Sequence, residues 1–430
     1  MLDSFRDFDN LTDEINRREA DKIRKQEKAR EEFNKETLDI ACNCRYALND
    51  FQTLLNNNVL AIGSSGTGKT RTLVEPNLKK AVGSSILIDP KGLIYNKHKD
   101  FLEQRGYNVL LLDLAHPERS MRYNPLDFVK TPQDVMRISE IITDKKASLG
   151  TRADPYWDNM TNIYLNAMIG YIVETNELPR CFSSVLTLMH EGTRKDEENK
   201  ITPLSQRFAR LKLKNPQSWA VSQFLNADSA PYKTYDTIRS TVAAKFANLD
   251  TPELRAMMSG NDIDFKRIGE EKTAVFVTVS DTDRSMDTMA NIFVTQSLQQ
   301  LCEHANDFAD GRLPVPVRFI LDDFATNCRI AEFPRIISTI RSRGISAMLM
   351  LQSEAQLTNY YGYDDKTVIS NCDTYVYLGG NDLETAKSIS ERANKPLAQI
   401  LNMPVGFCWV FRRGDPPVFT RLNRVGGRER

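Results

Sequence analysis

The chain has 430 residues, of which 41% are hydrophobic and 27% charged, a composition that excludes a disordered chain and suits a folded protein of more than one domain. Lys plus Arg and Asp plus Glu both number 57, so the overall charge gives no sign of nucleic acid, although a basic channel offset by acidic outer faces would give the same total. With no signal peptide and no apolar run near the roughly 18 residues of a membrane span, we expect a cytoplasmic protein without a transmembrane segment of its own.

Residues 1–50 are predicted to form a charged N-terminal helical segment. Lys, Arg and Glu are interspersed between residues 13 and 36, at spacings that allow ion pairs on the surface of a solvated helix. Such a helix either carries no chemistry or docks a partner protein.

Residues 51–131 alternate short apolar runs with helical stretches, the pattern of βαβ units in a parallel sheet. A helix is predicted at 71–80, and strands are predicted at 59–62, 84–89 and 107–113. We expect the second strand to lie beside the first. Asp89 and Lys91 at its end should then lie near a bound nucleotide or a subunit interface.

Residues 132–263 contain a block that is predicted to be entirely helical. Apolar positions recur at three and four residues, which predicts helices at 135–143, 157–175, 181–189, 201–212, 219–227 and 235–249. Within residues 264–430 further strands are predicted at 273–279, 317–321, 346–351, 374–378 and 407–412. The fold class is therefore α/β, with a mostly parallel central sheet interrupted by an all-α inserted domain.

A phosphate-binding loop follows the first predicted strand of the sheet. Gly-Ser-Ser-Gly-Thr-Gly-Lys-Thr at 63–70 fits G-x-x-x-x-G-K-[S/T] and opens a predicted helix, which is the context this pattern requires. Its glycines let backbone N–H groups wrap a phosphate, Lys69 neutralises the β- and γ-oxygens, and the Thr70 hydroxyl can bind Mg²⁺. The predicted ATP-binding residues are Gly63, Ser64, Ser65, Gly66, Thr67, Gly68, Lys69, Thr70 and Arg71.

The second candidate element of the site is acidic and directly follows the predicted strand at 317–321. Two carboxylates follow it, and we expect Asp322 to hold Mg²⁺ and Asp323 to orient or deprotonate the attacking water. Taken alone, such a pair could be only a helix N-cap. Motor ATPases usually have Glu at the second position, so the shorter Asp323 predicts slower hydrolysis or a closer strand.

Gln352 ends the strand expected beside this acidic strand, where its amide could sense the γ-phosphate and aim water. Arg341 and Arg343 lie between the two strand ends. Either could complete a neighbouring subunit's site as a trans arginine finger, or both could form a surface charge pair.

These segments resemble the coupling-protein ATPases of type IV secretion and conjugation, the VirD4/TraG group. The resemblance covers roughly residues 51–412 and rests on several motifs in the family's order, at 59–71, 75–77, 88–92, 123–126, 320–324, 341–344 and 351–353. It implies a RecA-like P-loop NTPase motor domain (51–131 and 264–430) with an all-α domain (132–263). It also favours Arg341 over Arg343, because Arg341 lies three residues before Gly344.

The resemblance implies an ATP-driven DNA-translocating motor, with Lys69, Asp323, Gln352 and Arg341 as catalytic residues. It would assemble as a hexameric ring and deliver relaxase-bound single-stranded DNA, or a protein substrate, to a type IV secretion channel. Leu93 replaces an acid of the family pattern, and the family's usual N-terminal transmembrane helices do not appear. We therefore expect a separate membrane-anchoring subunit and a peripheral position at the cytoplasmic face of the membrane. The alternatives are an ATP-binding adaptor with little hydrolysis and another FtsK/HerA-like DNA-pumping ring ATPase.

Overall fold

A computed structural model describes residues 2–143, 155–194, 201–247, 249–280, 282–324, 330 and 332–423 of the protein. The chain divides into two compact units, the first formed by Met1–Leu111, Asp264–Thr278 and Ser297–Arg430, the second by Leu112–Ile263 and Val279–Gln296. The predicted division into a motor domain and an all-α domain remains a prediction, because both domains include residues that the structure does not describe, such as 144–154 and 424–430. Within the described ranges, no helix combines the length and the apolar character needed to cross a membrane.

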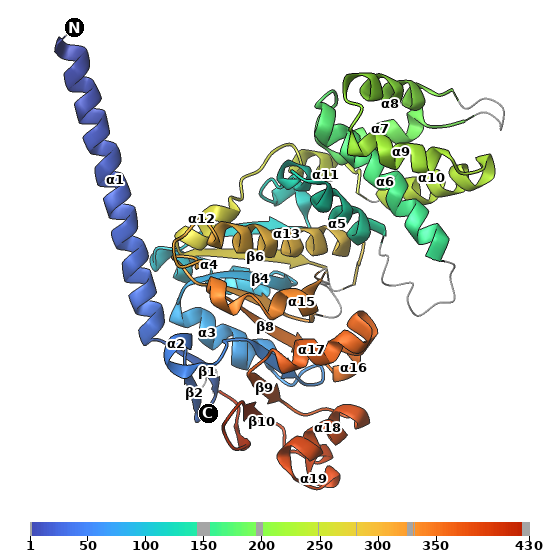
Figure 1. Ribbon diagram of the computed structural model, residues 1–430. Coiled ribbons are helices and arrows are strands. Elements are labelled where there is room, and N and C mark those ends of the chain that lie inside the picture. Colours follow the sequence, from blue (N-terminus) through green and yellow to red (C-terminus); the bar gives the residue numbers. More distant parts are fainter. Residues whose placement is uncertain are drawn as a thin grey trace. The chain divides into compact units, whose positions relative to one another are not determined.

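A nine-stranded sheet forms the framework of the first unit (Figure 1), with strand order β11-β10-β9-β3-β8-β7-β4-β6-β5. Its strands are β3 (Val59–Ile62), β4 (Ser84–Pro90), β5 (Asn108–Asp113), β6 (Thr273–Val279), β7 (Val317–Leu321), β8 (Ile345–Leu351), β9 (Thr374–Tyr377), β10 (Phe407–Arg412) and β11 (Val418–Arg421). The pairs from β9 through β3, β8 and β7 to β4 are parallel, whereas β9, β10 and β11 pair antiparallel. Strands β3, β6 and β8 are buried at every residue, which explains their unbroken apolar sequences.

All eight predicted strands are present, and the predicted α/β class is confirmed. The predicted position of the strand at 84–89 beside the strand at 59–62 was wrong, because β8 and β7 lie between β3 and β4. Helical crossovers allow strands that come later in the chain to insert between earlier neighbours, so order in sequence does not fix order in the sheet.

A small hairpin was not predicted. It consists of β1 (Thr37–Ala41) and β2 (Cys44–Ala47), which pair antiparallel. Asn77 joins this hairpin to the helix that follows the phosphate-binding loop: its Oδ1 accepts the Asp39 N–H at 2.9 Å, and its Nδ2 donates to the Asp39 carbonyl at 2.9 Å. The side chain of Asn77 thus bonds β1 much as a neighbouring strand would.

The first unit contains helices of very different length. They are α1 (Leu2–Lys35), α2 (Asp50–Thr53), the π-helical turn η1 (Thr70–Val74), α3 (Glu75–Lys80), α4 (Leu93–Gln104), α12 (Phe265–Glu270), α15 (Phe333–Ile337), the 3-10 turns η5 (Arg341–Arg343) and η6 (Gly362–Asp364), α16 (Glu354–Tyr361), α17 (Asp365–Ser370), α18 (Leu383–Ala393) and α19 (Leu397–Leu401). The expected charged helix is α1. Ion pairs join it to the rest of its unit, including Arg30 with Asp310 at 2.5 Å and Lys272 with Glu32 at 2.5 Å.

The second unit contains the helices that the sequence predicted between residues 132 and 263 (Figure 1). They are α5 (Pro132–Thr143), α6 (Pro155–Thr175), α7 (Phe182–Glu191), α8 (Pro203–Lys214), α9 (Trp219–Asp228), α10 (Tyr232–Ala247) and the short α11 (Pro252–Met257), and α13 (Asp287–Ala305) begins in the same unit. Aromatic side chains form its core, where Phe208 stacks on Phe224 with ring centroids 4.1 Å apart. The predicted helices are confirmed.

Candidate nucleotide-binding site

The phosphate-binding loop begins at the carboxyl end of β3, between its two neighbouring strands. The Gly63 N–H donates to the Leu351 carbonyl of β8 at 3.1 Å, and the Ser64 N–H donates to the Gly379 carbonyl after β9 at 3.0 Å. The loop is therefore anchored to both neighbours at the edge of the sheet where parallel strands place ligand-binding groups.

The structure explains why three positions of this loop are glycine. A Cβ on Gly63 would lie 2.7 Å from Thr67 Oγ1 and 2.9 Å from the Cβ of Leu378, so no larger residue fits there. Gly66 and Gly68 have φ angles of 79° and 88°, in the left-handed region that favours glycine. The loop thus has the tight curvature that phosphate-wrapping backbone requires. Ser65 and Gly66 are exposed at its tip, and Arg71 is exposed just beyond it.

Lys69 points back into the loop. Its side chain is buried, and its Nζ donates to the Gly63 carbonyl at 2.5 Å and to the Ser64 carbonyl at 3.3 Å. Burial lowers the pKa of the Lys69 ammonium, whereas the charges of Asp323 and Asp322 act in the opposite direction. The cation therefore lies between the loop and the two carboxylates after β7.

Thr70 and Asp322 are in direct contact, although 252 residues separate them. The Thr70 hydroxyl donates a hydrogen bond to Oδ2 of Asp322, which is buried at the end of β7. Burial raises the pKa of the Asp322 carboxyl, the bond from Thr70 lowers it, and the charge of Asp323 raises it further. A hydroxyl and a carboxylate at this spacing are the oxygen ligands that Mg²⁺ prefers, so the residues present fit that ion.

Asp323 has an unusual backbone conformation for a residue with a side chain. Its φ is 49°, and its N–H donates to Oδ1 of the preceding Asp322 at 3.1 Å. A left-handed residue two positions after the end of β7 turns the chain sharply, which Asp tolerates better than most residues. The carboxylate of Asp323 is only partly buried.

Asp89 contributes a third carboxylate at the same edge, from the end of β4. It is 1% exposed and accepts the Tyr95 N–H at 2.8 Å. The pKa of Asp89 is raised to about 6, chiefly by burial; hydrogen bonds from backbone N–H groups at the start of α4 oppose this rise, and the negative charge of Asp322 adds to it. Although β4 does not neighbour β3, Asp89 still lies near the acidic end of β7, its true neighbour.

Gln352 lies beside the loop, because it directly follows Leu351, whose carbonyl accepts the Gly63 N–H. Strand β8 runs between β3 and β7, as the sequence predicted for the strand next to the acidic one. The Gln352 side chain is exposed, and its backbone N–H donates to Gln356 Oε1 at 2.7 Å.

Arg341 lies at the opposite end of β8 from Gln352. A seven-residue strand spans about 23 Å, so Arg341 cannot reach the phosphate-binding loop of its own chain. Its Nη2 donates to the Asp50 carbonyl at 2.8 Å, and its Nε is 3.7 Å from Asp50 Oδ2. The same buried carboxylate binds Nη2 of Arg312 at 2.7 Å. Arg343 instead donates to the Thr339 carbonyl at 3.0 Å.

Sequence reasoning missed Asp50. It belongs to no recognisable motif, and it lies 291 positions from Arg341. The only signal was a single acid in a mixed polar and apolar segment, residues 48–55, which predicts nothing by itself. Among the residues described, no group of three or more His, Cys, Asp and Glu side chains forms another metal site.

Comparison with known proteins agrees with this geometry. The family described as "Type IV secretory system Conjugative DNA transfer" matches residues 10–395. The sequence is similar to type IV secretion system-coupling proteins VirD4 of Bartonella henselae and Bartonella quintana, each 22% identical over 363 residues that cover 80% of this chain and 54% of the relative. The chain thus spans about half the length of these curated relatives.

Solved structures share the fold at low sequence identity. Unbound bacterial conjugative coupling protein TrwBdeltaN70 matches with a TM-score of 0.63 and 15% identity over 87% of each chain. Plasmid coupling protein TrwB in complex with ADP and Mg²⁺ matches with a TM-score of 0.63 and 16% identity over 86% of each chain. The predicted RecA-like α/β fold is therefore confirmed.

Proposed function

The chain belongs to the type IV secretory system conjugative DNA transfer family, and from this premise we propose that it is an ATP-driven coupling protein. It recruits relaxase-bound single-stranded DNA, or a protein substrate, and delivers it to a type IV secretion channel. The observation that carries the proposal is the contact between the Thr70 hydroxyl and the Asp322 carboxylate, since it joins the two halves of a Mg²⁺-nucleotide site.

The loop supplies the nucleotide-binding groups. Backbone N–H groups around Gly66 and Gly68 would surround the phosphates, Lys69 would place its charge beside the β- and γ-oxygens, and Thr70 with Asp322 would hold Mg²⁺. When bound, Mg²⁺ neutralises the charge that develops on the phosphates. The related TrwB structures contain ADP with Mg²⁺ and an ATP analogue, which supports ATP and Mg²⁺ as the ligands of this chain.

We assign hydrolysis to Asp323, which follows Asp322, and to Gln352, which follows β8. Asp323 orients or deprotonates the attacking water, and Gln352, beside the loop, helps to aim it. Arg341 acts on the site of a neighbouring subunit, because the length of β8 keeps it away from its own loop. This arrangement requires a homo-oligomer, which we propose is a hexameric ring.

The remaining parts of the chain receive supporting roles. Residues 51–131 and 264–430 form the motor domain, residues 132–263 form the all-α domain that docks relaxase or protein effectors, and residues 1–50 form a helical segment for partner contacts. A membrane-anchoring subunit is a further proposed partner, with the ring at the cytoplasmic face of the membrane.

Steady-state ATP hydrolysis with and without single-stranded DNA tests the proposal. Stimulation by DNA that falls steeply with salt is expected, because phosphate contacts release counterions. Stimulation by duplex DNA alone would indicate an FtsK/HerA-like pump instead. Nucleotide binding without turnover would indicate the adaptor, a candidate that the short side chain of Asp323 favours.

A further inference from the structure

One buried carboxylate binds two arginines beside the amino end of β8. Oδ1 of Asp50 accepts a hydrogen bond from Nη2 of Arg312 at 2.7 Å, whereas Oδ2 of Asp50 lies 3.7 Å from Nε of Arg341. The backbone carbonyl of Asp50 also accepts a hydrogen bond from Nη2 of Arg341 at 2.8 Å. Asp50 therefore holds the Arg341 guanidinium at two points and divides its carboxylate between two cations.

The two arginines differ in their surroundings. The Arg312 side chain is only 9% exposed, and its guanidinium lies over the ring of Phe51, 4.8 Å from the ring centroid. The Arg341 side chain is 39% exposed, and its Nη1 has no acceptor among the residues that the structure describes. Two guanidinium groups share one carboxylate, so one positive charge is left without a partner in this cluster. The more exposed Arg341 is the group that can bring this charge to a further anion.

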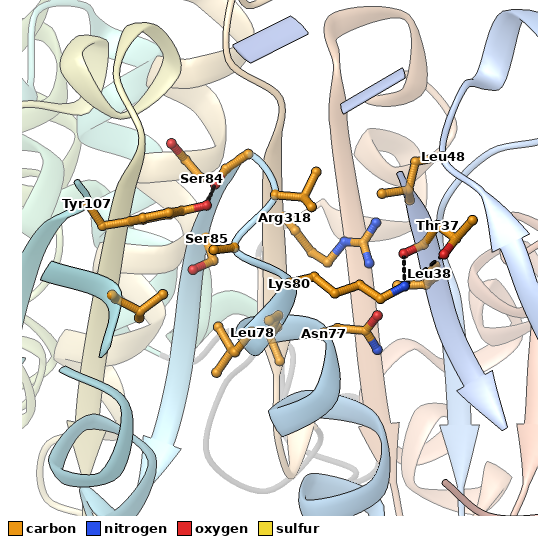
Figure 2. Close-up of a pocket in the computed structure, with 15 residues that line it drawn as sticks. Thr37, Leu38, Leu48, Asn77, Leu78, Lys80, Ser84, Ser85, Tyr107 and Arg318 are labelled. Carbon is orange, nitrogen blue, oxygen red and sulfur yellow. Dashed lines mark hydrogen bonds between the residues drawn. The ribbon is translucent and has the colours of Figure 1, made fainter. Parts of the chain in front are cut away.

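The segment that carries Asp50 is fixed on both sides. Before it, the Leu48 side chain is buried, and Figure 2 shows Leu48 among the residues that line a small cavity beside β1, Arg318 included. After it, Oδ1 of the buried Asn58 accepts the Ala347 N–H of β8 at 2.9 Å. A carboxylate on a backbone that is fixed on both sides can set the position of a flexible arginine.

A purely structural role would need only part of these contacts. The carboxylate of Asp50 neutralises Arg312, and a buried cation without a counter-charge would destabilise the fold. That role explains the bond to Oδ1. It does not explain why Oδ2 and the backbone carbonyl both face Arg341, whose side chain reaches the surface.

We infer that Asp50 is a positioning residue for Arg341, which it holds ready for the nucleotide site of a neighbouring subunit. This inference rests on the proposed role of Arg341 as a trans arginine finger. An unrestrained arginine loses rotamer freedom when it binds a phosphate, whereas an arginine already held in place has lost that freedom beforehand. The two contacts with Asp50 should therefore raise kcat roughly ten- to thirtyfold.

Steady-state ATP hydrolysis by the full chain carrying Asp50→Asn, with single-stranded DNA present, tests the inference. Asparagine keeps the shape of the side chain and an oxygen acceptor for Arg312, but its NH₂ group would face Nε of Arg341, which is also a donor. We expect kcat to fall roughly ten- to thirtyfold while KM for ATP stays as in wild type, because each subunit keeps its own phosphate-binding loop. The loss should be smaller than that of Arg341→Ala, about 10³-fold, since the asparagine variant keeps the arginine itself.

Two further measurements separate positioning from stability. Adding Asp50→Asn to Arg341→Ala should lower kcat no further, whereas losses that multiply would show that Asp50 acts independently of Arg341 and would overturn the inference. Mixing Asp50→Asn subunits with Lys69→Ala subunits should restore part of the activity, because the Lys69→Ala subunits supply an intact Asp50–Arg341 pair to intact loops. A mixture with only the averaged rate of its components would contradict positioning in trans.

Asp373→Asn is the matched control. Asp373 is also buried, pairs with Nε of Arg413 at 3.0 Å and accepts the Asn56 N–H at 2.6 Å, but its partners within the described part of the chain do not include Arg341. Asp373→Asn should lower Tm as Asp50→Asn does and leave kcat unchanged. Equal losses of kcat in both variants would mean that Asp50 acts through stability alone, which would overturn the inference.

A second variant covers the case in which Asp50→Asn does not fold. Asp50→Glu keeps the negative charge that Arg312 requires but moves the carboxylate by one methylene, so kcat should fall only where Arg341 is present. The two possible failures are distinguishable. An unchanged kcat in Arg341→Ala would remove the arginine finger from the proposed function, and the inference with it. A normal kcat in Asp50→Asn beside an impaired Arg341→Ala would overturn the inference alone.

Discussion

Replacing Asp89 with Asn should stabilise the protein in a pH-dependent way. Asp89 is almost completely buried at the end of β4, close to the negative charge of Asp322, and its pKa is raised from 3.8 to about 6. A raised carboxyl pKa means that the folded state favours the protonated form. The contribution of Asp89 to stability is therefore fully present below pH 3.8 and is lost as the pH rises through about 6.

The size of this effect follows from the shift in pKa. A difference of about 2 pKa units corresponds to roughly 3 kcal/mol between the two protonation states. The asparagine side chain would keep an oxygen acceptor for the Tyr95 N–H without the buried charge. The variant should thus gain about 3 kcal/mol above pH 7, which corresponds to roughly 6–12 °C in Tm for a unit of this size, and it should gain little near pH 4.

Calorimetry of wild type and Asp89→Asn between pH 4 and 8, without Mg²⁺ or nucleotide, measures this difference. Effects of all other titrating groups cancel to first order in the comparison, which leaves Asp89 and its coupling to Asp322. A difference in Tm that widens with pH supports the buried carboxylate pair. A difference that is constant across this range, or one that narrows with pH, refutes the reasoning.

Three further predictions concern the residues of the nucleotide site. Gly63→Ala should abolish ATP binding in a nucleotide-binding assay, because its methyl group would lie within 3 Å of two side chains; near-normal affinity would mean that the loop adapts. Asp323→Glu should raise kcat roughly tenfold, since a well-positioned general base contributes 10²–10⁴-fold, and an unchanged or lower rate in steady-state assays would show that Asp suits this site. Arg341→Ala should reduce kcat by about 10³-fold, and mixing it with Lys69→Ala subunits should restore part of the activity, because one variant supplies the loop and the other the arginine. Mixtures as inactive as their components would exclude action in trans.

The position of the groups in the proposed nucleotide site could be predicted from sequence, because each group follows a strand of a parallel sheet. The loop after residues 59–62 and the acids after 317–321 come at carboxyl ends, and carboxyl ends of parallel strands share one edge. This rule alone places Thr70 near Asp322, whatever the order of the strands between them. It also explains why Asp89 lies near Asp322 even though β4 was assigned the wrong neighbour.

Other features depend on register and on distant contacts, which no local pattern contains. The Asp50–Arg341 contact joins a four-residue helix to a 3-10 turn 291 positions away. Ser85, Arg318 and Ser346 are neighbours only because of the register of β4, β7 and β8, in which Arg318 pairs with both serines.

The most direct test of the central claim is steady-state ATP hydrolysis by the purified protein, with and without single-stranded DNA, beside Lys69→Ala. Lys69 is buried against the loop and faces the two carboxylates after β7, so its removal should abolish turnover while the protein stays folded. We predict hydrolysis that rises with single-stranded DNA and disappears in Lys69→Ala. Nucleotide binding without turnover under either condition, or turnover that persists in Lys69→Ala, would contradict it.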